Sequence, residues 1–153
     1  NVDLSKIKTT KIFKWLKSMN ISNQEMMRTF NCAKIYSNEI LKLSDKNLIS
    51  AAAHITGGGL IENLLRSIPE SFTLNVDLSK IKTTKIFKWL KSKNISNQEM
   101  MRTFNCGVGF CLIAPKKNIM KIQKMFAKKF KPYEIGIISK ENKKLNILNS
   151  LKW

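Results

Sequence analysis

The sequence predicts an α+β domain in which helices pack on a mixed β-sheet. Two observations support this class. Short apolar or alternating runs, typical of strands, are separated by amphipathic runs typical of helices, and the connections between them are short. At 153 residues the chain is long enough for one domain with its own core. No apolar run approaches the roughly 20 residues that span a bilayer, so we expect no membrane partner.

A long internal repeat sets the domain organisation. Residues 1–32 recur as residues 75–106, and the two copies differ only at Met19 and Lys93. Repeat proteins stack several shorter units that diverge at solvent-facing positions. This repeat has two copies, and the first begins in the middle of a predicted strand. We therefore interpret residues 1–32 as a peripheral duplicate, recent or artefactual, and residues 33–153 as the functional domain.

The elements between the two copies follow from apolar periodicity. Residues 34–43 predict an amphipathic helix, and the small apolar run 48–55 predicts a buried strand. Three glycines end this strand. The next helix is predicted over residues 60–68, where Glu62 and Arg66 are spaced for an i, i+4 ion pair, and Pro69 closes it.

The elements from the second copy onward alternate in the same way. A half-buried strand is predicted at 72–78, a helix at 84–93, and a second helix after the capping box Ser96–Glu99. Residues 107–114 predict an apolar strand that ends at Pro115. We expect Asn118 to cap a helix whose apolar face is Ile119, Ile122, Met125, Phe126 and Phe130. Residues 133–139 predict a strand, and residues 145–148 its short edge neighbour.

Charge and cysteine usage argue against specific nucleic-acid binding and against a cysteine metal site. The net charge is +18, but only three of the 28 basic residues are arginine, and the lysines are spread along the chain. Nucleic-acid binders concentrate charge on one face and add a recognised motif, so we expect no specific nucleic acid. Cys32, Cys106 and Cys111 lack metal-ligand spacing and predict buried free thiols in a cytoplasmic protein.

One histidine and three glycines form the sharpest candidate site. His54 is the only histidine of the chain, and Thr56 and Gly57–Gly59 follow it, between a predicted strand and a predicted helix. Unobstructed glycine amides at such a turn favour an anion such as phosphate. An imidazole at its mouth can contact phosphate or exchange protons near neutral pH. The alternative is a plain tight turn with a structural histidine.

A second polar constellation precedes the strand at 107–114. Arg102 and Asn105 lie where a helix-to-strand turn can present them to a ligand, and Gly107 and Gly109 follow. Such residues also serve as caps and surface ion pairs. The first copy keeps the arginine and the asparagine but lacks the glycines, so we expect no second site there.

Together the two strings resemble the aminoimidazole ribonucleotide synthetase family, also called phosphoribosylformylglycinamidine cyclo-ligase. The resemblance rests on His-Ile-Thr-Gly-Gly-Gly-Leu at 54–60, on Glu62, Asn63 and Arg66, and on Arg-Thr-Phe-Asn-Cys-Gly-Val-Gly at 102–109. It covers residues 34–150 and implies the α/β sandwich of that family's C-terminal domain, incomplete here at its N-terminal side.

The resemblance implies an ATP-dependent ring closure in purine synthesis. The formyl oxygen of formylglycinamidine ribonucleotide is phosphorylated by ATP, and an amidine nitrogen then closes the imidazole ring. By motif match, His54 becomes the catalytic candidate, and the candidates for substrate or phosphate binding are Thr56, Gly57, Gly58, Gly59, Arg102 and Asn105. ATP and Mg²⁺ are implied as well, with their main ligands in the family's N-terminal domain, which also builds its homodimer.

The departures from the family pattern shape the expected activity. The N-terminal domain is missing, Leu65 stands where the family commonly has proline, and no paired-carboxylate metal site is visible. We therefore predict that this chain alone has no cyclo-ligase activity. Three alternatives stay open: an inert or chimeric fragment, a basic nucleic-acid-binding module, and a sister ATP-dependent enzyme such as formylglycinamidine synthase or selenophosphate synthetase.

The two copies also compete for one place in the core, because they share the same apolar helix residues. The second copy is continuous with its strand and should win, since loop closure disfavours the swap. We expect the first copy to be helical but peripheral.

Overall fold

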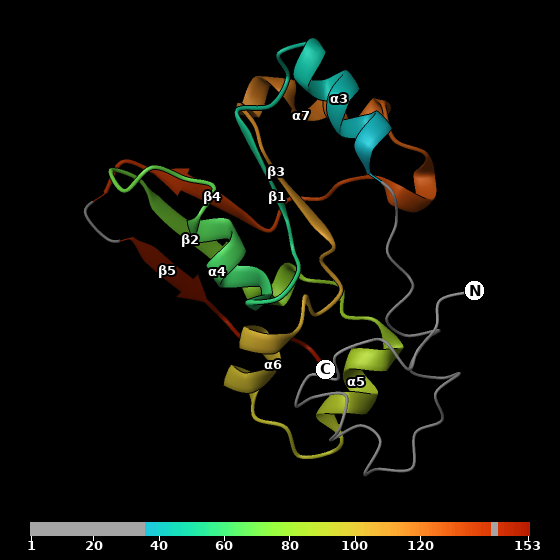
Figure 1. Ribbon diagram of the computed structural model, residues 1–153, viewed down its shortest axis with the longest axis vertical. Helices are drawn as coiled ribbons and strands as arrows, with labels where there is room; N and C mark the ends of the chain where they lie inside the picture. Colours follow the sequence, from blue (N-terminus) through green and yellow to red (C-terminus); the bar gives the residue numbers. More distant parts are fainter. Residues whose placement is uncertain (1–35, 142–143) are drawn as a thin grey trace, which may run out of the picture. The chain divides into compact units, whose positions relative to one another are not determined.

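The computed structural model describes residues 36–141 and 144–153, and Figure 1 shows their arrangement. These residues fall in the compact unit Ile35–Trp153. The first copy of the repeat lies outside the described residues, and so do the predictions made for it, including its helix and Cys32.

The described part of the chain is an α+β structure, as predicted. Its helices are α3 (Ser37–Asp45), α4 (Gly59–Leu65), α5 (Lys85–Lys91), α6 (Asn97–Thr103) and α7 (Ile119–Lys124). Its strands are β1 (Ala51–His54), β2 (Thr73–Asp77), β3 (Phe110–Ile113), β4 (Gly136–Ser139) and β5 (Leu145–Leu148). Single 3-10 turns occupy Leu78–Lys80, Lys116–Asn118 and Lys128–Phe130. Within the described ranges, none of the helices is long and apolar enough to cross a membrane.

The strands form two separate ladders. β1 pairs with β3 in antiparallel register, from Ala51 opposite Ile113 to His54 opposite Phe110. β2 is the central strand of the other sheet, with β4 antiparallel on one side and β5 parallel on the other. The prediction that residues 145–148 neighbour the strand at 133–139 is therefore wrong. Thr73, Leu74 and Val76 of β2 are buried, whereas no residue of β4 or β5 is buried, as is typical of a central strand between two edge strands.

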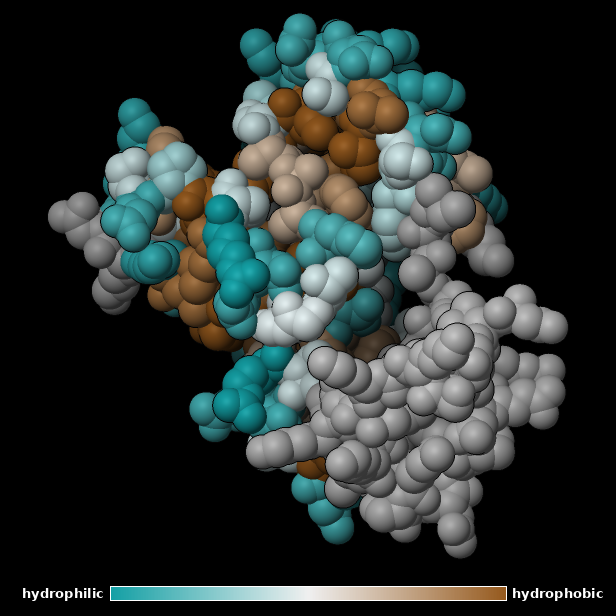
Figure 2. Space-filling model, in the orientation of Figure 1, coloured by the Kyte–Doolittle hydropathy of each residue, from teal (hydrophilic) through white to brown (hydrophobic). Residues whose placement is uncertain are grey.

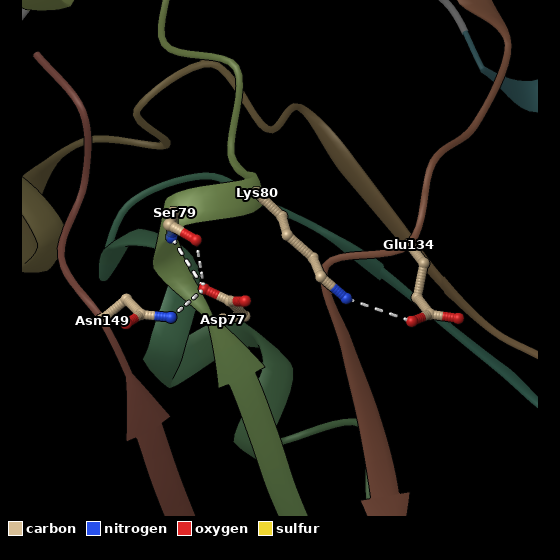
Figure 3. Close-up of polar contacts among 5 residues, drawn as sticks. All are labelled: Asp77, Ser79, Lys80, Glu134 and Asn149. Carbon is tan, nitrogen blue, oxygen red and sulfur yellow. Dashed lines mark hydrogen bonds and ion pairs between the residues drawn. The ribbon is translucent and has the colours of Figure 1, made fainter.

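The carboxylate of Asp77 forms several hydrogen bonds at the end of β2. One of its oxygens accepts hydrogen bonds from the Ser79 amide at 3.0 Å, from the Ser79 hydroxyl at 2.7 Å and from Asn149 Nδ2 at 2.9 Å (Figure 3). These hydrogen bonds, that from Asn149 first, hold the pKa of Asp77 below its usual value. Lys80, one residue further on, reaches Glu134 at 3.3 Å before β4.

A small apolar core joins α3 and α7 to the first ladder. Leu43 of α3, Leu48 before β1 and Ile122 of α7 are buried together, and Leu112 of β3 packs against them. Figure 2 shows hydrophilic residues on the outer side of α3 and apolar residues beneath it. This core fixes the start of β1, whose other end carries the candidate site.

Asn118 does not cap α7 with its side chain, contrary to the prediction. Its Nδ2 instead donates a 3.0 Å hydrogen bond to the carbonyl oxygen of Leu48, and the residue is buried. The helix is also shorter than its apolar pattern suggests, because it ends at Lys124 and Phe130 belongs to a separate 3-10 turn. The Asn118 side chain therefore binds a residue 70 positions away in the sequence instead of capping its own helix.

Other local predictions are confirmed. The Ser96 hydroxyl accepts a hydrogen bond from the Glu99 amide at 3.1 Å and starts α6. Arg66 pairs with Glu62 on α4. Cys106 and Cys111 are buried free thiols, and burial raises the pKa of Cys106 to about 11 and that of Cys111 to about 12.

Candidate functional site

The candidate site begins where β1 ends. His54 is the last residue of β1, and its side chain is exposed. Its imidazole stacks on Phe110, the residue opposite it on β3, with 5.7 Å between ring centroids and 24° between ring planes. Tyr36, just before α3, lies 5.0 Å from the Phe110 ring and 6.3 Å from the imidazole. The rings of Phe110 and Tyr36 therefore pack beside His54.

Tyr36 also lies against Gly109. A Cβ atom at Gly109 would lie 2.4 Å from the Tyr36 hydroxyl oxygen, closer than any real contact. Burial raises the pKa of Tyr36 above its usual value. The Gly109 carbonyl accepts a 3.0 Å hydrogen bond from the Ile55 amide. The histidine strand is thereby joined to the glycines that precede β3.

The loop from Thr56 to Gly59 turns the chain from β1 into α4. The Thr56 carbonyl accepts a 3.2 Å hydrogen bond from the Gly59 amide, and the Thr56 side chain is exposed. Gly58 and Gly59 have left-handed backbone angles, with φ of +91° and +68°. Gly57 is exposed and has no positive φ.

Asn63 supports this loop from within α4. Its Nδ2 donates to the carbonyl oxygens of Gly57 at 3.1 Å and of Gly59 at 2.7 Å. Asn63 belongs to the string that carries the family resemblance, but sequence reasoning gave it no role. The available signal was its position, four residues after the last glycine, which places an amide one helical turn beyond the loop.

The end of α6 lies directly against the glycine loop. A Cβ atom at Gly59 would lie 1.8 Å from the Met101 carbonyl oxygen and 3.0 Å from the Arg102 carbonyl carbon. The absence of a side chain at Gly59 therefore lets α4 and α6 approach closely. The structure thus brings together two strings that are more than 40 residues apart in the sequence.

The side chains of Arg102 and Asn105 make local contacts. Arg102 is exposed and forms a 2.9 Å ion pair with Glu99. A hydrogen bond from Thr103, followed by the charge of Arg102, holds the pKa of Glu99 below its usual value. The Asn105 side-chain oxygen accepts a 3.0 Å hydrogen bond from the Gly107 amide and shapes the turn into β3.

The described residues do not provide a metal site. Across 36–141 and 144–153, no three His, Cys, Asp or Glu side chains come close enough to hold an ion.

Comparisons with known proteins match the part of the chain that contains these segments. The family "AIR synthase related protein, C-terminal domain" matches residues 33–146. The phosphoribosylformylglycinamidine cyclo-ligase of Staphylococcus epidermidis is 36% identical over 79% of this chain, and that of Staphylococcus aureus strain Newman is 33% identical over 84%. The trifunctional purine biosynthetic protein adenosine-3 of Gallus gallus is 42% identical over 67% of the chain.

The chain spans only part of these relatives. It covers 36% and 39% of the two staphylococcal cyclo-ligases and 10% of the chicken protein. The matched region includes the histidine–glycine loop, the turn after α6 and nearly every described element. The chain therefore belongs to the family of AIR synthase related protein C-terminal domains.

Proposed function

We propose that this domain supplies part of the active-site surface for ATP-dependent closure of formylglycinamidine ribonucleotide to aminoimidazole ribonucleotide. One observation carries the proposal. The two strings that are characteristic of the cyclo-ligases meet in space, because Gly59 abuts the end of α6 and Ile55 is hydrogen-bonded to Gly109. Around that junction lie an exposed imidazole and an exposed glycine backbone.

The geometry supports the roles that we propose for these residues. His54 is accessible and held by stacking, so it can exchange a proton with a substrate or contact a phosphate without searching for a rotamer. Thr56 and the amides of Gly57 and Gly58 would face the phosphorylated substrate, and Gly59, whose amide donates to the Thr56 carbonyl, would shape the loop. Arg102 and Asn105 are weaker candidates, since both already have local partners.

We further propose that ATP and Mg²⁺ are held mainly by the portion of the relatives that this chain does not span, and that the complete enzyme is a cytoplasmic homodimer. In that arrangement the described domain orients the substrate, and the chemistry requires both parts. The purified chain should then release no ADP above background when it is mixed with substrate, ATP and magnesium. Turnover near that of an intact cyclo-ligase would contradict this expectation.

Binding can be tested separately from turnover. Because His54 is the only histidine, its Cε1 proton gives a single resolved NMR signal in the wild-type chain. Titration with formylglycinamidine ribonucleotide, or with ribose 5-phosphate as a simpler probe, should shift that signal saturably. A signal that stays unchanged with both probes would favour the alternative, an inert fragment without a specific ligand.

A further inference from the structure

The segment between β3 and β4 carries a local concentration of positive charge. Residues 115–132 contain seven lysines and no aspartate, glutamate or arginine. Six of these lysines have described side chains, and all six are exposed: Lys116, Lys117, Lys121, Lys124, Lys128 and Lys131. Among the described residues, none of the six forms an ion pair with a carboxylate. We refer to these six lysines, together with Met120, as the lysine face.

The packing of α7 turns this charge toward solvent. Ile122 of α7 is buried in the small core with Leu43 of α3, and the two helices lie side by side (Figure 1). Lys121 and Lys124, on either side of Ile122 in the sequence, are exposed. The adjacent helix α3 carries acidic as well as basic residues, so the excess of positive charge belongs to residues 115–132.

The lysine face lies away from the candidate site. β3 begins with Phe110, which is opposite His54, and ends with Ile113, and the lysines begin at Lys116. They therefore follow the end of the β1–β3 ladder that is remote from the imidazole. A ribonucleotide bound at His54 does not account for them, so the lysine face requires an anionic partner of its own.

An exposed apolar side chain within the lysine face indicates the kind of partner. Met120 is 70% exposed, the largest value among the exposed large apolar residues that the structure describes, and Lys124 lies one helical turn after it. The phosphates of a nucleic acid gain nothing from a thioether, and nucleic-acid recognition favours arginine. An anionic lipid surface accepts both groups, because ammonium groups meet the headgroups while an apolar side chain enters the boundary beneath them.

We propose that the lysine face docks this domain peripherally on an anionic lipid surface. The ammonium groups contact the phosphate and carboxylate groups of the lipids, and Met120 enters the acyl boundary. The expectation of no membrane partner came from the lack of a spanning segment, and surface docking requires none. The cytoplasmic leaflet of a membrane has the negative surface potential that such docking needs. Docking there is independent of the chemistry proposed at His54.

The test measures co-sedimentation of the full chain with two kinds of vesicle, one of phosphatidylcholine alone and one of equal parts phosphatidylcholine and phosphatidylserine. The chain should bind only the second kind, and more weakly as salt is raised. The paired substitution Lys121→Gln with Lys124→Gln should weaken this binding about thirtyfold, as expected for two lysines at an anionic surface.

The matched control is Lys85→Gln with Lys88→Gln. It removes the same charge from two exposed positions of the same spacing on another helix, α5. Because distant charges are screened, the control should weaken vesicle binding by less than about threefold. Equal losses from the two pairs would overturn the proposal, since the net charge rather than the lysine face would then hold the vesicles. Absence of binding to the phosphatidylserine vesicles would overturn it as well.

Met120→Gln separates a lipid surface from a nucleic acid. This variant should bind the phosphatidylserine vesicles several times more weakly and should bind a double-stranded RNA oligonucleotide as the wild-type chain does. Vesicle binding that Met120→Gln leaves unchanged would overturn the proposal, because the face would then be a phosphate surface without an apolar contact. All five substituted side chains are exposed, so each variant should keep the wild-type Tm. The response of the His54 proton to ribose 5-phosphate should also be unchanged, which keeps this test separate from that of the proposed function.

Discussion

The two hydrogen bonds from Asn63 to the glycine loop give the sharpest prediction about stability. Asn63→Ala removes the donor that holds the carbonyls of Gly57 and Gly59. Two such bonds contribute about 1–3 kcal/mol in net terms. Alanine is a better helix former than asparagine by up to about 0.7 kcal/mol, which offsets part of the loss. The free energy of unfolding should therefore fall by roughly 0.3–2.3 kcal/mol when the full offset applies.

Asn38→Ala is the matched control, because Asn38 lies exposed in the first turn of α3. Urea unfolding followed by circular dichroism should show no loss of stability for Asn38→Ala and a clear loss for Asn63→Ala. Equal midpoints for the two variants would refute the reasoning, since the loop bonds would then contribute nothing measurable.

The Asn63→Asp variant tests the same two hydrogen bonds through the pH dependence of stability. Its carboxylate would face two carbonyl oxygens, so the pKa of the new carboxyl would rise above the usual value of about 3.9. The protonated form can still donate one hydrogen bond. Relative to Asn63→Ala, the variant should be most stable below about pH 4 and should lose stability as the pH rises through the folded-state pKa. A pH-independent difference between the two variants would contradict this.

Three further predictions concern the rest of the fold. Asn118→Ala should lower the free energy of unfolding by about 1–3 kcal/mol in a urea titration, because it leaves the buried Leu48 carbonyl without its donor. Since the pKa of Asp77 is depressed in the folded state, its stabilising effect is present above its unfolded pKa and is lost as pH falls; Asp77→Asn should flatten the acid limb of the stability curve. Cys106 and Cys111, whose pKa values are about 11 and about 12, should resist a thiol reagent at pH 8 until the chain is unfolded, as mapped by peptide mass spectrometry.

Local patterns were sufficient to predict most elements of the described structure. The Ser96 cap, the Glu62–Arg66 pair and the positions of the strands depend on residues close in sequence, and each is found. The partner of β5 and the role of Asn118 depend on residues about 70 positions away. No local signal encodes those pairings, so both predictions failed.

The candidate site also combines features that the local sequence shows with contacts that only the fold shows. The pattern identified His54 and the glycine loop, since an isolated histidine before three glycines is visible in the sequence. Two close contacts of the site join segments that are remote in the chain. Tyr36 packs against Gly109, and Gly59 packs against Met101. Only the fold can show that one glycine accommodates a tyrosine and another accommodates a helix, and that Gly57 does neither.

The central place of β2 has a consequence for synthesis. Both strands that flank it come from residues 136–148, which a ribosome makes long after β2 itself. A nascent chain therefore carries both edges of β2 unpaired until residues 136–148 have been made. Folding of this sheet must wait for that later segment, and chaperones that shield unpaired strand edges should be most needed in that interval.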